Sequence, residues 1–64
     1  CNTIYLNNFF HSLMFTKKKL TFIDHNMREM QNLKFLDLTG NKITMIENLP
    51  ASLEELYLAS NFIT

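Results

Sequence analysis

Few side chains in this 64-residue sequence could do chemistry, and their spacing gives little support to a reaction. His11 and His25 are the two histidines, and neither has a cysteine or a second histidine at the spacing of a zinc site. Ser12, Asp24 and His25 could be combined on paper into a nucleophile, an orienting carboxylate and a base. No Gly-x-Ser-x-Gly or comparable local motif accompanies them, so we interpret both histidines as surface or corner residues. We therefore expect neither an enzyme nor a metal site.

Other ligand classes lack a matching motif as well. The single glycine, Gly40, excludes a glycine-rich phosphate loop, and the single cysteine, Cys1, excludes an internal disulfide. Six Lys and Arg residues balance six Asp and Glu residues, which is unlike the strongly basic composition of nucleic-acid binders. The one cationic run, Lys17 to Lys19, is interpreted as a solvated face. We expect no cofactor, no small-molecule substrate and no nucleic acid.

The sequence carries no signal for a membrane or for export. No apolar run reaches the roughly 18 residues of a membrane helix, and the start lacks a cationic segment followed by an apolar one. The lone cysteine and the lack of an Asn-x-Ser/Thr sequon favour a reducing, cytoplasmic compartment. Because the sequence begins at Cys1 and stops at Thr64, shortly after a repeat motif, we expect it to be a fragment of a longer protein.

The elements that must position any binding residues come from a repeat in the second half. The pattern L-x-x-L-x-L-x-x-N-x-I occurs at residues 33–43 and again at residues 53–63, twenty residues later (53 − 33 = 20). The two later leucines alternate with period 2, which predicts a short strand with one buried face. The asparagine then falls where an amide can donate to and accept from the backbone of a corner. We expect burial of Leu36, Leu38, Leu56 and Leu58, and corner hydrogen bonds from Asn41 and Asn61.

The connections and the first half follow the pattern less closely. Ile43, Ile46 and Leu49 recur at threes, which favours a 3₁₀ or helical return, and Pro50 ends any helix. In the first half, Leu20 aligns with Leu36 as a strand residue. This alignment puts Phe22 at the second strand position and His25 at the corner, although a shift of one residue would put Asn26 there instead. An earlier copy would use Cys1, Ile4, Leu6 and Phe9.

The pattern at residues 33–63 resembles the leucine-rich repeat family. The phrase Met45-Ile-Glu-Asn-Leu-Pro50 is similar to the short intracellular subclass, which includes regulatory subunits of protein phosphatase 1 and axoneme-associated proteins. The resemblance implies an α/β solenoid with short parallel strands on its concave face and 3₁₀, irregular or helical returns. Residues 1–64 would form one repeat segment, with clear repeats at 33–52 and 53–64 and degenerate repeats or a cap at 1–32. The subclass implies a cytoplasmic protein associated with the cytoskeleton or a cilium.

In such solenoids the concave sheet is the usual binding platform, so the resemblance implies a protein–protein interaction module for an unidentified protein partner. Among the residues between the core leucines, we interpret Phe35 as a packing residue and Tyr57 as a binding anchor. The 20-residue offset places Asp37 beside Tyr57 and Phe35 beside Glu55 on neighbouring strands. Two alternatives stay open: a structural cap or spacer without a ligand, and a fragment of an enzyme whose active domain lies elsewhere. The predicted binding residues are Lys34, Phe35, Asp37, Thr39, Glu54, Glu55 and Tyr57, and the weaker copies add Lys19, Thr21, Ile23, Thr3, Tyr5 and Asn7.

Overall fold

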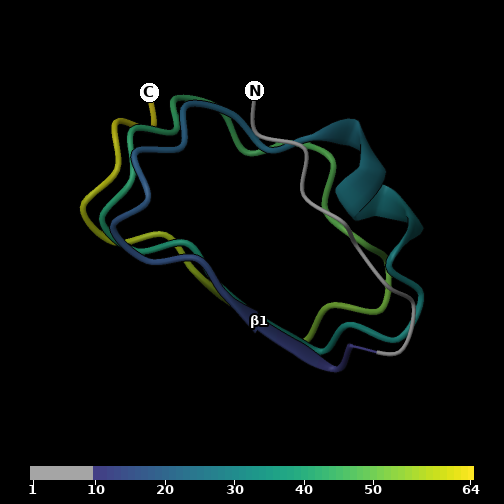
Figure 1. The fold of residues 1–64 in the computed structure, drawn as a ribbon. Helices are drawn as coiled ribbons and strands as arrows, with labels where there is room; N and C mark the ends of the chain where they lie inside the picture. The colour runs from purple at the N-terminus through teal and green to yellow at the C-terminus, as the bar shows by residue number, and fades with distance from the viewer. Residues whose placement is uncertain (1–9) are drawn as a thin grey trace.

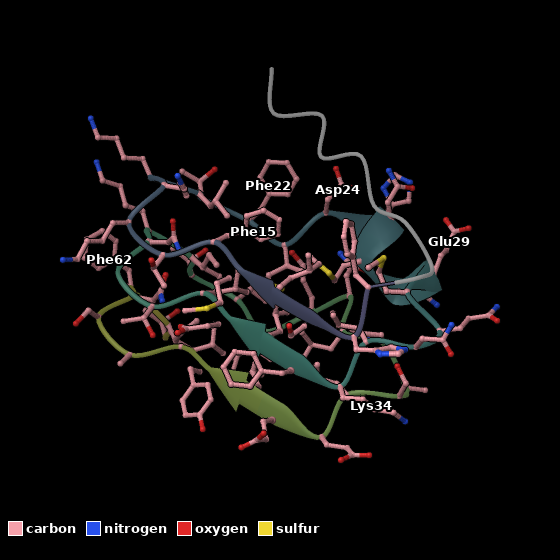
Figure 2. The ribbon with its side chains drawn as sticks, turned by 60° about the horizontal axis from the view of Figure 1, so that its bottom comes forward. Phe15, Phe22, Asp24, Glu29, Lys34 and Phe62 are labelled. Carbon is pink, nitrogen blue, oxygen red and sulfur yellow. The ribbon has the colours of Figure 1, made fainter. Side chains whose placement is uncertain are left out.

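The computed structural model describes residues 10–64, and three short strands in it form one parallel sheet (Figure 2). The strands β1 (Ser12–Met14), β2 (Phe35–Asp37) and β3 (Glu55–Tyr57) lie in this order across the sheet. Parallel neighbours cannot be joined by a tight hairpin, so a long return must bring the chain back before each new strand. The first return contains the 3₁₀ helix η1 (His25–Glu29), which lies across the ring of chain from β1 (Figure 1).

The register of the sheet shows that the predicted alignment of the first half is wrong. Leu13, not Leu20, pairs with Leu36, and Leu36 pairs with Leu56. The first turn is therefore 23 residues long (36 − 13 = 23) and the second is 20 (56 − 36 = 20). Leu20 instead occupies the position of Ile43, seven residues after its strand leucine. The pattern missed this strand because Lys18, rather than asparagine, stands at its corner.

The other residues of that alignment have different places as well. Phe22 is not a strand residue and its side chain is 58% exposed. His25 and Asn26, the two residues considered for the corner, both lie in η1. The still earlier copy falls on residues 1–9, outside the described residues, and so do the face positions assigned to it.

The apolar core lies between the sheet and the returns. Leu36 and Leu38 are buried as predicted, with 0% and 2% exposure. Leu56 and Leu58 are only half-buried, which corrects the expectation for them, because β3 has a neighbouring strand on one side only among residues 10–64. Ile23, predicted for the sheet face, is instead a core residue. The buried apolar residues are Ile23, Met27, Met30, Leu33, Leu36, Leu38 and Ile43.

Each strand is followed by a corner with the same backbone conformation. Lys17, Gly40 and Ser60 occupy equivalent positions, and all three have positive φ angles of 55°, 78° and 56°. The left-handed region suits glycine and strains other residues, so one of the three corners has the residue best adapted to it. Neighbouring corners are joined by backbone hydrogen bonds, from Lys17 N to Thr39 O at 3.0 Å and from Gly40 N to Ala59 O at 2.9 Å.

The two asparagines hold these corners together, as predicted. Asn41 is 3% exposed, and its Oδ1 accepts from the backbone nitrogens of Lys18 and Leu20, both at 3.0 Å. Its Nδ2 donates to Phe15 O at 2.7 Å and to Leu38 O at 2.8 Å. Asn41 follows β2, while Phe15, Lys18 and Leu20 follow β1. The amide of one turn therefore completes the corner of the turn before it.

Asn61 repeats this arrangement one turn later. Its Oδ1 accepts from Ile43 N at 3.0 Å, and its Nδ2 donates to Leu38 O at 2.8 Å and Leu58 O at 3.1 Å. Because Asn61 is only half-buried, it is the weaker member of the pair.

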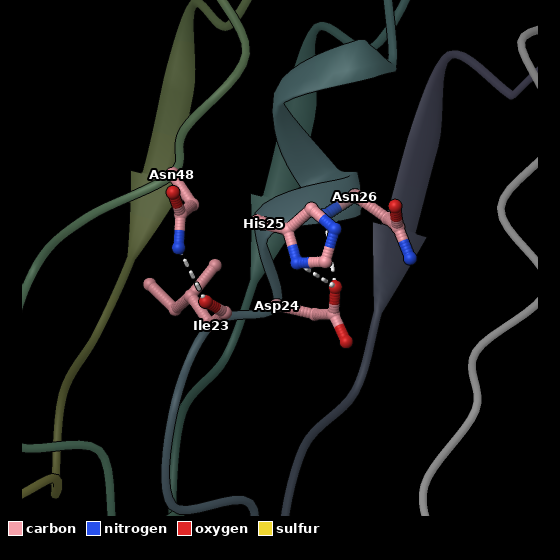
Figure 3. Close-up of polar contacts among 5 residues, drawn as sticks. All are labelled: Ile23, Asp24, His25, Asn26 and Asn48. Carbon is pink, nitrogen blue, oxygen red and sulfur yellow. Dashed lines mark hydrogen bonds and ion pairs between the residues drawn. The ribbon is translucent and has the colours of Figure 1, made fainter.

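The two returns differ in structure. In the first, Asp24 caps η1 by accepting from Asn26 N at 2.8 Å, as Figure 3 shows. The second return is irregular, since residues 43–49 form no helix and Ile46 is 52% exposed. Asn48, with φ 56°, fixes this return by donating from Nδ2 to Ile23 O at 2.9 Å (Figure 3). Of the forms expected from the sequence, the return after β2 therefore has the irregular one and neither the 3₁₀ nor the helical one.

Within residues 10–64, no helix has the length and apolar character needed to cross a membrane.

Candidate protein-binding surface

One face of the sheet points away from the apolar core. Side chains alternate along a strand, so the residues on either side of each core leucine share the opposite face. In β2, Leu36 is fully buried while Phe35 and Asp37 on either side are partly exposed. We call this surface the outer sheet face. Its members are Ser12 and Met14 from β1, Phe35 and Asp37 from β2, and Glu55 and Tyr57 from β3.

Four of these residues form a square with alternating chemistry. The register pairs Phe35 with Glu55 and Asp37 with Tyr57, which confirms the neighbours predicted from the 20-residue offset. One diagonal holds two aromatic rings, which we call the aromatic pair, Phe35 and Tyr57. Their centroids are 5.3 Å apart and their planes are tilted by 48°. The other diagonal holds the carboxylate pair, Asp37 and Glu55.

Local hydrogen bonds orient both carboxylates. Asp37 Oδ1 accepts from the backbone nitrogen of Thr39 at 3.0 Å and from its Oγ1 at 2.6 Å. Glu55 Oε1 accepts from the hydroxyl of Tyr57 at 3.3 Å. Of the predicted binding residues, Thr39 therefore holds the Asp37 carboxylate at the end of β2, and Tyr57 donates along its own strand to Glu55.

The charges on this side of the sheet are not balanced. Lys34 Nζ lies 3.6 Å from Glu54 Oε2, at the start of the two strands, so these two exposed charges largely neutralise each other. Within the described part of the chain, neither Asp37 nor Glu55 has an ion-pair partner. The carboxylate of Glu55, through its charge and its hydrogen bond, raises the pKa of Tyr57 above the usual 10.0, with smaller contributions from desolvation and from Asp37.

The structure brings the predicted binding residues together and adds one that the sequence did not indicate. Met14, paired in register with Asp37, is 64% exposed on the outer sheet face. Tyr57 is 46% exposed, whereas its diagonal neighbour Phe35 is half-buried. The shift of the first strand explains why Met14 was missed. The period-2 pair Leu13-x-Phe15, just before the lysine run, is the one sequence signal that could have indicated it.

The residues considered for chemistry lie elsewhere. His25 Nδ1 is 3.4 Å from Asp24 Oδ1, and the His25 side chain is 77% exposed (Figure 3). The same carboxylate oxygen already caps η1. Over residues 10–64, Ser12 donates no hydrogen bond to His25, and no group of three His, Cys, Asp or Glu residues could hold a metal ion. The three lysines of the cationic run are all exposed at the first corner.

Comparison with known families adds one match. The family model for the Leucine Rich Repeat matches residues 32–51, which contain β2, its asparagine corner and most of the second return. Searches of the curated proteins and of the solved structures return no match for the chain. The family match supports a leucine-rich repeat protein, and the three parallel strands with few helical residues are compatible with a fragment of this type. Leucine-rich repeats generally mediate protein–protein interaction and are typically not enzymes.

Proposed function

We propose that this chain is a protein-binding segment of a leucine-rich repeat array and that its outer sheet face contacts the partner. The observation that carries the proposal is the exposure of aromatic and charged side chains on a sheet face with no chain packed over it among residues 10–64. Tyrosine in particular supplies apolar contact area together with a hydrogen-bonding group, and it is enriched at binding hot spots. The proposed contact residues are Lys34, Phe35, Asp37, Thr39, Glu54, Glu55 and Tyr57, together with Met14.

We also propose that the turns continue as a curved solenoid with this face on its concave side. The apolar side chains left exposed near β3 support the proposal, since Phe62 is 59% and Ile63 37% exposed, and Leu56 and Leu58 are half-buried. A further turn stacked on β3 would cover them. The same observation favours the second candidate function, a spacer between other repeats, which needs no ligand on the sheet.

The phrase at residues 45–50 supports assignment to the short intracellular subclass and, with it, a cytoplasmic location. These two proposals concern the whole protein, and fractionation of cells that express it with an epitope tag tests the location. Recovery in a secreted or membrane fraction would contradict both.

The binding proposal also predicts a weak contact for three turns alone. Three strands of three residues cover roughly 10 Å by 10 Å of sheet, far below the roughly 800 Å² per partner of a standard interface. We therefore expect measurable partner binding from the full array and weaker binding from residues 1–64.

The test compares variants of the full-length protein in partner capture. Tyr57→Ala and Asp37→Lys change the outer sheet face, and Glu47→Lys makes a similar charge change on the irregular return. Captured proteins should be lost with the first two variants and kept with the third, while circular dichroism remains that of the wild type. Loss with Glu47→Lys alone would place binding on the return instead, and retention by all three variants would favour the spacer.

A further inference from the structure

The outer sheet face combines aromatic rings and carboxylates in one small pattern. The aromatic pair and the carboxylate pair form the two diagonals of one square, so any group placed over its centre touches both kinds of side chain. The Cα atoms at opposite corners of such a square, one on each strand, are roughly 8 Å apart across the sheet. One guanidinium or ammonium group is small enough to lie between two carboxylates at that spacing.

We propose that the outer sheet face binds a basic segment of a protein partner, with an arginine or lysine side chain lying over the aromatic pair and between the two carboxylates. This inference rests on the proposed function and names the partner's chemistry. A cation over a tyrosine or phenylalanine ring is attracted by the negative ring face, and each carboxylate adds a charge-assisted hydrogen bond.

The charges around the square support a cationic ligand. No cation of residues 10–64 forms an ion pair with either carboxylate, and the nearest one by sequence, Lys34, is paired with Glu54. The raised pKa of Tyr57 reports the same negative potential, because Glu55 and Asp37 both disfavour the phenolate. An anionic ligand would meet two like charges here, and a purely apolar one would desolvate both carboxylates without supplying a cation to balance their charge.

Met14 extends the ligand preference beyond one charge. It lies on the far side of Asp37 from Tyr57 in the same row of the sheet, and it is the most exposed apolar side chain of the three strands. An apolar residue next to the basic one would rest on this flexible thioether, which adapts to varied shapes. The expected ligand is therefore a segment with alternating basic and apolar residues rather than a block of positive charge.

The experiment is an NMR titration of the ¹⁵N-labelled 64-residue chain with three blocked heptapeptides. One alternates leucine with arginine, the second has lysine in place of arginine, and the third has citrulline, which keeps the shape of arginine without its charge. The arginine peptide should bind about tenfold more tightly than the citrulline peptide at low salt, and the difference should shrink as salt rises. Shifts should centre on residues 12–14, 35–37 and 55–57.

A double variant, Asp37→Asn with Glu55→Gln, tests whether the carboxylate pair is responsible. Both changes keep an oxygen that can accept from Thr39 and Tyr57, so the fold should persist and the spectrum should stay dispersed. The variant should bind the arginine and citrulline peptides equally, whereas the control Glu47→Gln should keep the wild-type preference.

The outcomes separate this inference from the proposed function. Equal binding of charged and uncharged peptides at the three strands would overturn the cation site and leave the binding face intact. A preference for arginine that survives in the double variant, or no binding of any peptide, would also overturn it. Shifts confined to the returns would contradict both proposals.

Discussion

Replacement of Asn41 by alanine tests the structural role of the corner amide most directly. The change removes four hydrogen bonds between the Asn41 side chain and the backbone. Leu38 O keeps a partner, because Asn61 also donates to it. Three groups lose the bond to Asn41 without such a substitute: the backbone nitrogens of Lys18 and Leu20 and the carbonyl of Phe15.

The magnitude follows from how well water can replace each lost bond. Lys18 is exposed, so water can reach its nitrogen, whereas Leu20 and Phe15 are half-buried. A buried group left without a partner costs about 1–3 kcal/mol, so two half-buried groups give a loss of about 2–4 kcal/mol. A domain of this size is stable by only about 3–5 kcal/mol. The variant Asn41→Ala should therefore be largely unfolded at room temperature or close to it.

The matched control is Asn61→Ala. It also removes four bonds, but Leu38 O keeps the bond from Asn41 and Ala59 O keeps the bond from Gly40 N. Only Ile43 N and Leu58 O lose their partner, and because Asn61 itself is half-buried, water can reach this corner, so about 1–2 kcal/mol should be lost. Urea unfolding followed by circular dichroism measures both values, and an unchanged m value would show that the denatured state is comparable. Equal losses in the two variants, or a loss below about 1 kcal/mol for Asn41→Ala, would refute the argument from burial and from the number of groups left unpaired.

Three further predictions concern packing, the corner and the face. Leu36→Ala should cost about 2–5 kcal/mol in thermal or urea unfolding and Leu56→Ala clearly less, because only the first leucine is fully buried. Equal costs would contradict the assigned core. Gly40→Ala should cost about 1–2 kcal/mol, since the φ of Gly40 is 78° and a Cβ there would lie 3.1 Å from the side chain of Lys17. An unchanged unfolding midpoint would contradict this. In an ultraviolet pH titration the pKa of Tyr57 should lie above 10.0, so that its neutral phenol persists to a higher pH than in a free tyrosine, and Glu55→Gln should lower this pKa. No change in that variant would mean that Glu55 is not the cause.

The second half of the fold could be predicted from the sequence because its signals are local. The alternation of Leu36 with Leu38 and the asparagine three residues later both lie within one short segment, and each has a direct physical meaning. The register between β2 and β3 followed from a repeat of constant length, and it placed the aromatic and carboxylate pairs side by side. The binding role of that square stays a prediction.

The sequence by itself determined the repeat, the strands β2 and β3 and the positions of the two asparagine corners, because each is marked by residue types within one short motif, as at residues 33–43. Only the tertiary structure decided the place of β1. Its corner has Lys18 where the pattern requires asparagine, and the hydrogen bonds that complete this corner come from Asn41 in the next turn, 23 residues away. Tertiary structure likewise placed Met14 beside Asp37 and left Leu56 half-buried, because both depend on which strand lies alongside.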